Sequence, residues 1–308
     1  MIDPLLERFR RGDRLALARL LSLLSRGQET GAILAGLGPP AKKSRVVAVT
    51  GSGGVGKSTL VGRLIEYLRG RGLTVAVLAC DPQSPLSGGA LLGDRFRMPS
   101  RPDDDGVFIR SLVAASGHGA LAEHLPAMIR LLEAFGFDVI VLETAGAGQG
   151  DTAVRELADV LVLLLQPETG DDLQWEKAGL LEVADIVAIH KADLPGAESA
   201  AAQVRAALDL AGVRPVPVLR VSAKTGEGLE ALLEAVAAGP VRPRGKDADL
   251  RDLLRLAQEA LATRFAEAEA TSDVQELVAA WQRGDLDDSA AAAAILRMLS
   301  PRCPSGRG

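Results

Sequence analysis

A glycine-rich segment between an apolar run and a helical pattern constrains the fold more than any other feature of the chain. Residues 51–59 read GSGGVGKST, follow the apolar run 46–49 and precede the amphipathic segment 60–68. A strand, a glycine-rich turn and a helix in this order are the context of a phosphate-binding P-loop. Backbone N–H groups can converge there on phosphate oxygens, and the helix N-terminus adds partial positive charge. The segment therefore predicts a nucleotide-binding α/β domain.

Two side chains of this loop suit contact with a nucleoside triphosphate. Lys57 would reach the β- and γ-phosphates, and the Ser58 hydroxyl would ligate Mg²⁺. Lys57 is also a candidate catalytic cation, because it would stabilise charge on the transferred phosphoryl group. The other positions expected in the phosphate cradle are Gly53, Gly54, Val55, Gly56 and Thr59.

Length and composition leave room for more than this domain. The 308 residues exceed the roughly 200 that one such domain needs, and 47% hydrophobic residues argue against global disorder. A net charge of −5 does not suggest a nucleic-acid partner, and two cysteines are too few for a disulfide scaffold. No secretory signal is visible, and no apolar run is long enough to span a bilayer. We expect a cytoplasmic protein that binds neither nucleic acid nor membrane.

Strand and helix patterns alternate from residue 45 onward. Most strand candidates are continuous runs of Val, Ile, Leu and Ala, as expected for strands buried on both faces of a largely parallel sheet. They lie at 46–49, 75–80, 107–112, 138–142, 160–165, 185–189 and 217–221. Helical patterns fill most gaps, including 120–135, 198–211 and 228–237. The expected fold is therefore an α/β P-loop NTPase domain with a mainly parallel sheet.

Helical extensions are expected on both sides of this domain. Residues 4–26 predict one helix, and residues 27–40 have the character of a linker. Patterns at 247–270 and 272–299 predict two or three further helices, which pack either on another chain or on the same domain. The predicted domains are an N-terminal helical extension at 1–40, a P-loop domain at 41–240 and a C-terminal helical arm at 241–308.

Two short motifs, each directly after a strand candidate, point to guanine. Asp193, in Lys191-Ala192-Asp193, can accept hydrogen bonds from guanine N1–H and the exocyclic amine, which adenine does not offer in that place. The Lys191 stem can lie over the base, and the backbone of Ser222, Ala223 and Lys224 would contact guanine O6. Together with the P-loop, these motifs resemble the set found in GTPases, so GTP and GDP are the expected ligands.

One position departs from the GTPase pattern. Asparagine usually stands where this chain has His190. An imidazole can donate one hydrogen bond toward the base or the P-loop, but we do not expect it to bond both sides as an amide does. Guanine preference would then rest mainly on Asp193, with lower affinity. The alternative is that His190 is a loop residue merely tolerated at this position.

Acidic residues after two strand candidates predict the metal site. Asp81 follows 75–80 and Glu143 follows 138–142, where a Walker-B carboxylate would hold Mg²⁺ or its waters. Asp94 could join them, which makes Ser58, Asp81, Asp94 and Glu143 the expected metal ligands and the three carboxylates candidate catalytic groups. The Gly146 N–H would reach the γ-phosphate, so the loop after it could act as a switch.

Longer motifs carry a family resemblance. They are 78–85 (LACDPQSP), 88–98 (GGALLGDRFRM), 143–149 (ETAGAGQ) and 170–174 (GDDLQ). Together they resemble the MeaB/ArgK group of G proteins. The resemblance implies a GTPase that serves an adenosylcobalamin-dependent acyl-CoA mutase as a chaperone, gating cofactor loading and protecting the enzyme. It also implies a homodimer through the C-terminal helices, and it maps a segment that contacts the mutase onto 170–177, with Lys177 as a charged contact.

Two other protein classes remain as alternatives. A nickel metallochaperone GTPase shares the fold class, but it would be expected to carry a Cys- or His-rich metal segment, and the three histidines here form no such cluster. A ParA/MinD-like ATPase is suggested by residues 53–57. That class needs a lysine where Ser52 stands and would not need the Lys191-Ala192-Asp193 motif.

Overall fold

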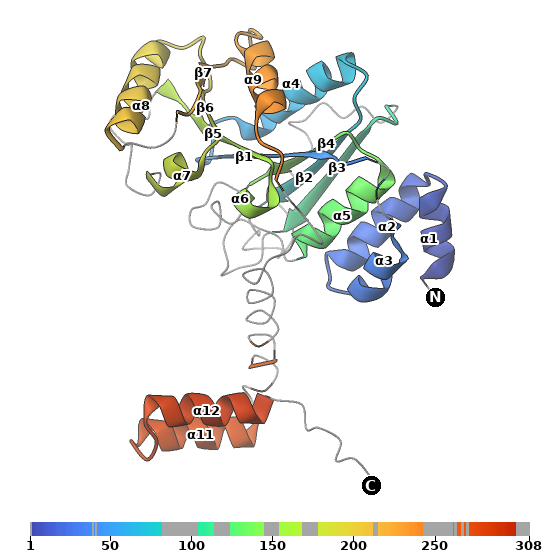
Figure 1. Ribbon diagram of the computed structural model, residues 1–308, viewed down its shortest axis with the longest axis vertical. Helices are drawn as coiled ribbons and strands as arrows, with labels where there is room; N and C mark the ends of the chain where they lie inside the picture. Colours follow the sequence, from blue (N-terminus) through green and yellow to red (C-terminus); the bar gives the residue numbers. More distant parts are fainter. Residues whose placement is uncertain are drawn as a thin grey trace. The chain divides into compact units, whose positions relative to one another are not determined.

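The chain divides into two compact units, Met1–Arg242 and Pro243–Gly308. The computed structural model describes residues 2–38, 40, 42–81, 104–113, 124–144, 154–167, 178–211, 215–242, 261, 264–265, 268 and 271–299. The first unit contains a β-sheet covered by helices, and the second contains a helical pair (Figure 1).

One parallel sheet forms the centre of the first unit. Its seven strands are β1 (Arg45–Gly51), β2 (Val75–Asp81), β3 (Val107–Val113), β4 (Val139–Glu143), β5 (Val160–Leu165), β6 (Ile186–Ile189) and β7 (Val218–Arg220). They lie in the order β3-β2-β4-β1-β5-β6-β7, and every pair of neighbours is parallel. The parallel sheet predicted from the apolar runs is therefore confirmed, and each strand lies close to its expected bounds.

The packing of β1 explains why these strands read as continuous apolar runs. Val46 and Ala48 belong to the hydrophobic cluster on one face of the sheet, whereas Val47 and Val49 belong to the cluster on the other. Since helices cover both faces, neither set of side chains meets water, and the alternation of polar and apolar residues is lost.

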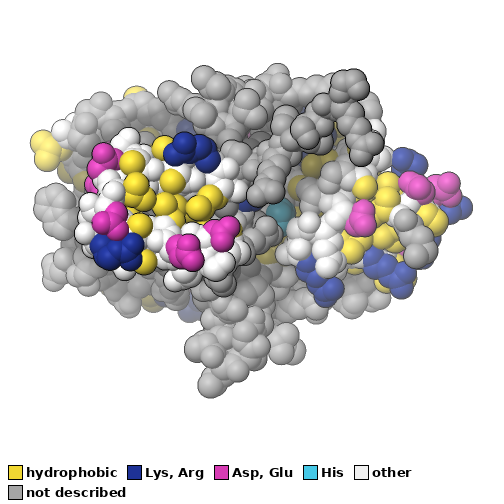
Figure 2. Space-filling view, turned by 90° about the horizontal axis from the view of Figure 1, so that it is seen from below, with side chains coloured by type: hydrophobic (Ala, Val, Ile, Leu, Met, Phe, Trp, Pro, Cys, Tyr) yellow, Lys and Arg dark blue, Asp and Glu magenta, His cyan; other side chains and the backbone are white. Residues whose placement is uncertain are grey.

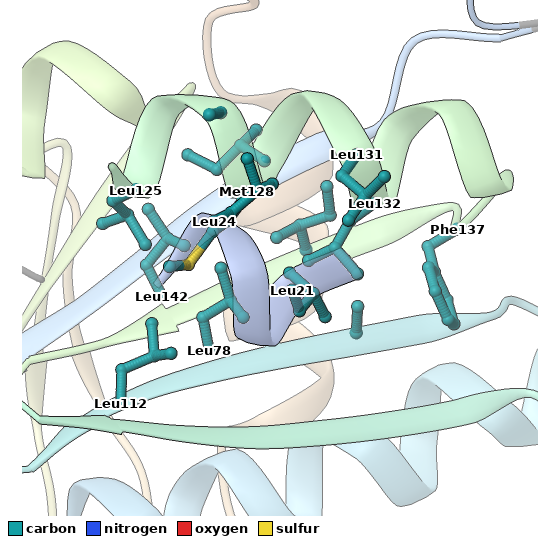
Figure 3. Close-up of a cluster of buried hydrophobic side chains, with 14 of the residues drawn as sticks. Leu21, Leu24, Leu78, Leu112, Leu125, Met128, Leu131, Leu132, Phe137 and Leu142 are labelled. Atoms are coloured by element: carbon teal, nitrogen blue, oxygen red, sulfur yellow. The ribbon is translucent and has the colours of Figure 1, made fainter. Parts of the chain in front are cut away.

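Helices cover both faces of this sheet. Those of the first unit are α1 (Asp3–Arg10), α2 (Arg14–Leu24), α3 (Thr30–Gly36), α4 (Lys57–Gly70), α5 (Leu125–Phe135), α6 (Val154–Leu157), α7 (Ala178–Val183), α8 (Ala197–Ala211) and α9 (Leu229–Ala238). Helices α4 and α9 pack on one face, and α2 and α5 pack on the other. Figure 3 shows Leu21 and Leu24 of α2 beside Met128 of α5, next to Leu78 and Leu142 of the sheet. A third cluster, with α7 and α8, covers β5 and β6.

Two predictions for the N-terminal region are wrong. The single helix predicted at 4–26 is divided into α1 and α2, because Gly12 has a φ of +81° and Asp13 accepts hydrogen bonds from N–H groups of the first turn of α2. The segment 27–40, predicted as a linker, contains α3, whose Ile33 is fully buried in the cluster with α2 and α5. Tertiary packing therefore stabilises a helix that its glycine-rich sequence conceals.

Two buried carboxylates anchor the strands at the amino edge of the sheet. Asp159, which is fully buried before β5, accepts hydrogen bonds from the backbone N–H of Val46 at 2.9 Å and of Arg242 at 2.8 Å. Asp185, buried before β6, accepts one from the backbone N–H of Leu161 at 2.9 Å. Each carboxylate thus joins the beginning of one strand to another segment of the chain.

Two arginines complete this arrangement. Arg242 Nη2 lies 3.0 Å from Asp185 Oδ1, and Arg155 Nη2 of α6 lies 3.4 Å from the same oxygen. Arg155 Nε also donates to the carbonyl of Val183, at the end of α7, at 2.7 Å. Asp159, Asp185, Arg155 and Arg242 are referred to below as the amino-edge network.

The second unit contains α11 (Ser272–Gln282) and α12 (Asp288–Leu299). The pattern at 272–299 therefore forms two helices, whereas most of the segment predicted at 247–270 lies outside the described residues. Val274 of α11 is buried, but Trp281, Leu296 and Met298 are each almost half exposed. Figure 2 shows hydrophobic side chains of this pair at the surface, bordered by acidic and basic ones. None of the described helices has the length and apolar character needed to cross a membrane.

Candidate nucleotide site

A cavity of about 620 Å³ opens at the carboxyl edge of the sheet. Its walls come from the turn after β1, the end of β4 and the turns after β6 and β7. The lining residues are Gly53, Gly54, Gly56, Lys57, Ser58, Thr59, Glu143, Thr144, His190, Lys191, Asp193, Leu194, Ser222, Ala223 and Lys224. Parallel strands present their carboxyl ends at one edge, so motifs far apart in the sequence meet there.

The turn after β1 has the geometry of a phosphate-binding loop. It runs from the end of β1 into α4, which begins at Lys57. The Lys57 side chain is buried, and its Nζ donates to the carbonyl oxygens of Gly51 at 3.0 Å and Ser52 at 3.1 Å. The ammonium is thus held at the loop by weak neutral acceptors, which an anionic phosphate could replace.

Gly56 is required at its position for two reasons. Its φ of +99° belongs to the left-handed region, which side chains disfavour. A Cβ added there would also lie 2.6 Å from Cε1 of the His190 ring. The phosphate loop and the turn after β6 therefore approach each other too closely for any side chain at Gly56.

Ser58 and Glu143 meet where β1 and β4 end. Glu143 is the last residue of β4 and lies opposite Val49 of β1, beside the phosphate loop. The Ser58 hydroxyl donates to Glu143 Oε1 at 2.6 Å, and both side chains are buried. The next residue, Thr144, donates its N–H to Val49 and its hydroxyl to Thr50, which fixes the end of β4 against β1.

The turns after β6 and β7 are joined at Asp193. The Ser222 hydroxyl donates to Asp193 Oδ1 at 2.7 Å, and Lys224 Nζ lies 3.7 Å from Oδ2. The hydrogen bond from Ser222, followed by smaller effects that include the charge of Lys224, lowers the pKa of Asp193 below 3.8. The carboxylate is therefore ionised at neutral pH and faces the cavity as a hydrogen-bond acceptor.

Lys191 also connects two turns. It has a left-handed backbone, with a φ of 57°, and its Nζ lies 2.8 Å from Gln166 Oε1 and 3.4 Å from the carbonyl oxygen of Gly54. Its side chain thus runs from the turn after β6 to the phosphate loop and to the residue after β5.

His190 bonds on both sides, contrary to the expectation from its chemistry alone. The ring is buried, with Nδ1 2.8 Å from the carbonyl oxygen of Val55, while the Ala223 N–H points to Nε2 at 3.4 Å. The prediction counted donors only, whereas a neutral imidazole offers one donor and one acceptor. Burial, the largest effect, lowers the pKa of His190 below 6.5, which favours this neutral form.

Most predicted site residues border one cavity, while Val55 does not line it and others lie outside the described residues. The side chain of Val55, a residue of the loop, is buried in the hydrophobic cluster that includes α4. Asp81 ends β2, which is separated from β1 by β4, and its side chain lies outside the described part. Asp94, Gly146 and the segment 170–177 with Lys177 also lie outside the described residues. Among the described residues, no three His, Cys, Asp or Glu side chains form a potential metal cluster.

The sequence reasoning missed three residues of this region. Thr144 and Leu194 line the cavity, and Gln166 holds Lys191. Thr144 and Leu194 directly follow Glu143 and Asp193, so their positions next to predicted site residues could have indicated that they line the cavity. Gln166 carries no such signal, because its role depends on a contact with a residue of another strand.

Comparison with known proteins identifies the family. A sequence model of the family described as methylmalonyl Co-A mutase-associated GTPase MeaB matches residues 17–270. The chain belongs to the MeaB family of GTPases. Hydrolysis of GTP is therefore its activity, and this assignment is favoured over the metallochaperone and ParA/MinD-like alternatives.

Individual relatives agree with the family assignment. A protein of Mycobacterium tuberculosis named as a probable GTPase is 36% identical over 320 residues, which cover 97% of this chain and 95% of that protein. A fused isobutyryl-CoA mutase of Nocardia farcinica is 38% identical over 296 residues, which cover 89% of this chain and 26% of that protein. A crystal structure described as an LAO/AO transport system kinase shares the fold, with a TM-score of 0.66 and 23% identity over 97% of each chain.

Proposed function

We propose that this MeaB-family protein is a Mg²⁺-dependent GTPase that acts as a switch and chaperone for an adenosylcobalamin-dependent acyl-CoA mutase. The observation that carries the site assignment is the convergence of three turns on one cavity of about 620 Å³. The turn after β1 would bind the phosphates, and the turns after β6 and β7 would bind guanine.

In this proposal the phosphate loop stabilises the charge that develops during hydrolysis. Lys57 exchanges its carbonyl partners for the β- and γ-phosphates. The backbone N–H groups of the loop and the first turn of α4 hold the same oxygens in place. The Gly146 N–H would sense the γ-phosphate, and the loop after it would change conformation when that phosphate leaves.

The oxygen donors at the end of β4 fit Mg²⁺. The Ser58 hydroxyl and the Glu143 carboxylate lie 2.6 Å apart at the wall of the cavity, and Mg²⁺ prefers such hard oxygen ligands. Ser58 and Glu143 would hold the ion or its waters, with Asp81 and Asp94 as further candidate ligands. The ion would neutralise negative charge on the phosphate oxygens.

Base recognition would rest on Asp193. Its ionised carboxylate is oriented by the Ser222 hydroxyl and can accept from N1–H and the exocyclic amine of guanine. The Lys191 stem would lie over the base, and the backbone of Ser222, Ala223 and Lys224 would reach O6. An adenine in this place would leave the carboxylate without a donor, which disfavours ATP.

The proposed mutase partner is supported by the comparisons. The family is described as associated with methylmalonyl-CoA mutase, and one relative is a single chain that includes isobutyryl-CoA mutase. Domains fused in one relative often interact as separate chains in another. We propose that GTP binding and hydrolysis gate cofactor loading into the mutase, with the segment 170–177 as the contact.

A second copy of the chain is the proposed partner of the C-terminal helices. Trp281, Leu296 and Met298 are each almost half exposed on α11 and α12, and large apolar side chains gathered at a surface are typical of an association site. Burying such residues against the same helices of another protomer would give a homodimer.

The mutase proposal can be tested with purified components. The protein is mixed with isobutyryl-CoA mutase or methylmalonyl-CoA mutase, with GDP or a non-hydrolysable GTP analogue. Complex mass and transfer of adenosylcobalamin, followed by visible absorbance, are recorded. We expect a complex and a transfer rate that depend on the nucleotide for at least one enzyme. Absence of complex and of nucleotide-dependent transfer with both enzymes would contradict the proposal.

A further inference from the structure

His190 connects the phosphate loop with the turn after β7. Its Nδ1 lies 2.8 Å from the Val55 carbonyl, which can only accept, so Nδ1 carries the proton. The Ala223 N–H, 3.4 Å from Nε2, can only donate, so Nε2 must carry a lone pair. The two contacts together require a neutral ring in one tautomer.

We propose that His190 is a positioning residue whose neutral ring joins the phosphate loop to the turn after β7, one of the two turns that would bind guanine. Protonation of the ring would then weaken guanine-nucleotide binding. This inference rests on the proposed base site and adds that nucleotide binding there depends on pH. A protonated ring keeps the bond to Val55 but turns an N–H toward the N–H of Ala223. Two donors then face each other, and the turn that carries Ala223 loses its hydrogen bond to the ring while keeping the bond from Ser222 to Asp193.

The ring has little freedom to avoid this conflict. It is 4% exposed and lies against Gly56 so closely that a Cβ there would be 2.6 Å from it. Rotation of the ring would place carbon atoms where Val55 and Ala223 now find polar partners. When the ring is protonated, either the phosphate loop or the turn after β7 must therefore move.

Burial and the charged groups around the ring together set the pH range of the effect. Lys191, on the same turn, opposes protonation, and Asp193 favours it, while burial is the largest effect and lowers the pKa of His190 below 6.5. Lys57 of α4 and Lys224 of the turn after β7 line the same cavity. The ring is thus mainly neutral at pH 6.5 and above, and the junction is lost as the pH falls from there through the lowered pKa.

Asp193 does not produce the same response. Its pKa is lowered below 3.8, chiefly by the hydrogen bond from Ser222, so the carboxylate stays ionised while His190 titrates. A loss of affinity as the pH falls below 6.5, while Asp193 stays ionised, would therefore come from the histidine and not from the carboxylate beside it.

The test compares two histidine-to-asparagine variants. An amide supplies a donor and an acceptor without titrating, so His190→Asn keeps the junction and removes its pH dependence. His124→Asn is the matched control, because His124 precedes α5 with a φ of 66°, which asparagine tolerates, and does not line the cavity. Calorimetry with GDP and Mg²⁺ from about pH 8 to about pH 5 gives the affinity of each protein.

We expect wild type and His124→Asn to lose roughly five- to tenfold more affinity than His190→Asn over this range, the worth of one hydrogen bond. Protonation of the nucleotide phosphates affects all three proteins equally and cancels in the ratio. Binding at pH 8 with parallel curves for all three would overturn this inference but leave the base site standing. No GDP binding at pH 8 in any of them would overturn both.

A second measurement does not depend on the His190 variant. The imidazole ¹⁵N shifts of the nucleotide-free wild type report the tautomer and midpoint of each histidine, with His118→Asn and His124→Asn assigning the other two. We expect His190 to carry its proton on Nδ1 and to titrate below pH 6.5. A proton on Nε2, or a midpoint at or above that value, would overturn the inference.

Discussion

The two edges of the parallel sheet both bury charged side chains, but the partners differ. At the amino edge, the carboxylates of Asp159 and Asp185 accept hydrogen bonds from backbone N–H groups, and Asp185 also pairs with the side chains of Arg155 and Arg242. At the carboxyl edge, Lys57, Glu143 and the turns after β6 and β7 border a cavity of about 620 Å³.

This difference separates stability from binding. Removing one partner of a buried ion pair leaves the other charge uncompensated, so the free energy of unfolding decreases. Lys57 lies beside a cavity and donates to neutral carbonyls that a charged ligand could replace, so removing its side chain should impair binding and catalysis. We therefore expect variants of the two edges to show opposite phenotypes.

The largest effect is expected at Lys57. Lys57→Ala should lower the rate of GTP hydrolysis about a thousandfold or more and weaken GTP binding, with an almost unchanged melting temperature. Phosphate release and thermal unfolding measure the two properties. Lys43→Ala, which removes an exposed lysine outside the cavity, is the control. Turnover within tenfold of wild type would contradict the assignment of Lys57.

The amino-edge network should give the reverse result. Arg242→Met removes the guanidinium from buried Asp185 and should lower the free energy of unfolding by about 3 kcal/mol, with GDP affinity of the folded protein unchanged. Arg71→Met, which breaks an exposed pair with Glu230, should cost less than about 1 kcal/mol. Urea unfolding and calorimetry are the measurements. Equal costs for the two variants would show that the network does not stabilise the sheet.

Base specificity depends on a single carboxylate in this account. Asp193→Asn should weaken GTP binding about a hundredfold and improve binding of xanthosine triphosphate, because one acceptor becomes a donor. Competition binding with both nucleotides measures the change. If GTP affinity is the same in the variant, Asp193 does not contact guanine.

The smallest effect is expected at Lys224. Its side chain is 82% exposed and its Nζ lies 3.7 Å from Asp193 Oδ2, so salt and water screen the pair. Lys224→Ala should weaken GDP binding about threefold or less, and the difference should shrink at high salt. A loss of tenfold or more, independent of salt, would place the Lys224 side chain in the binding contact itself.

The sequence predicted those parts of the fold that depend on local chemistry. Apolar runs such as 46–49 mark strands covered on both faces, and the glycine-rich loop with Lys57 and Ser58 marks the end of β1. The sequence also carries a signal for the division of the first helix, because glycine ends helices and aspartate caps their beginnings. The apolar periodicity on both sides of Gly12 nevertheless favours one continuous helix, which is why the single-helix prediction is wrong.

Long-range partnerships could not be predicted in this way. Nothing near Arg242 in the sequence indicates that it meets Asp185, and nothing near Gln166 indicates that it meets Lys191. The acceptor capacity of a neutral His190 ring follows from its chemistry, but its partner does not, because the Ala223 N–H that approaches Nε2 comes from another strand's turn. The roles predicted for Asp81, Asp94 and Gly146 stay predictions.

Nucleotide binding itself tests the central claim most directly, that the carboxyl edge is a guanine-nucleotide site. Calorimetry at pH 8 with Mg²⁺ compares GDP and a non-hydrolysable GTP analogue with the matching adenine nucleotides. The account predicts a guanine preference of about a hundredfold or more, because adenine leaves Asp193 without a donor. Equal affinity for the adenine nucleotides would contradict it.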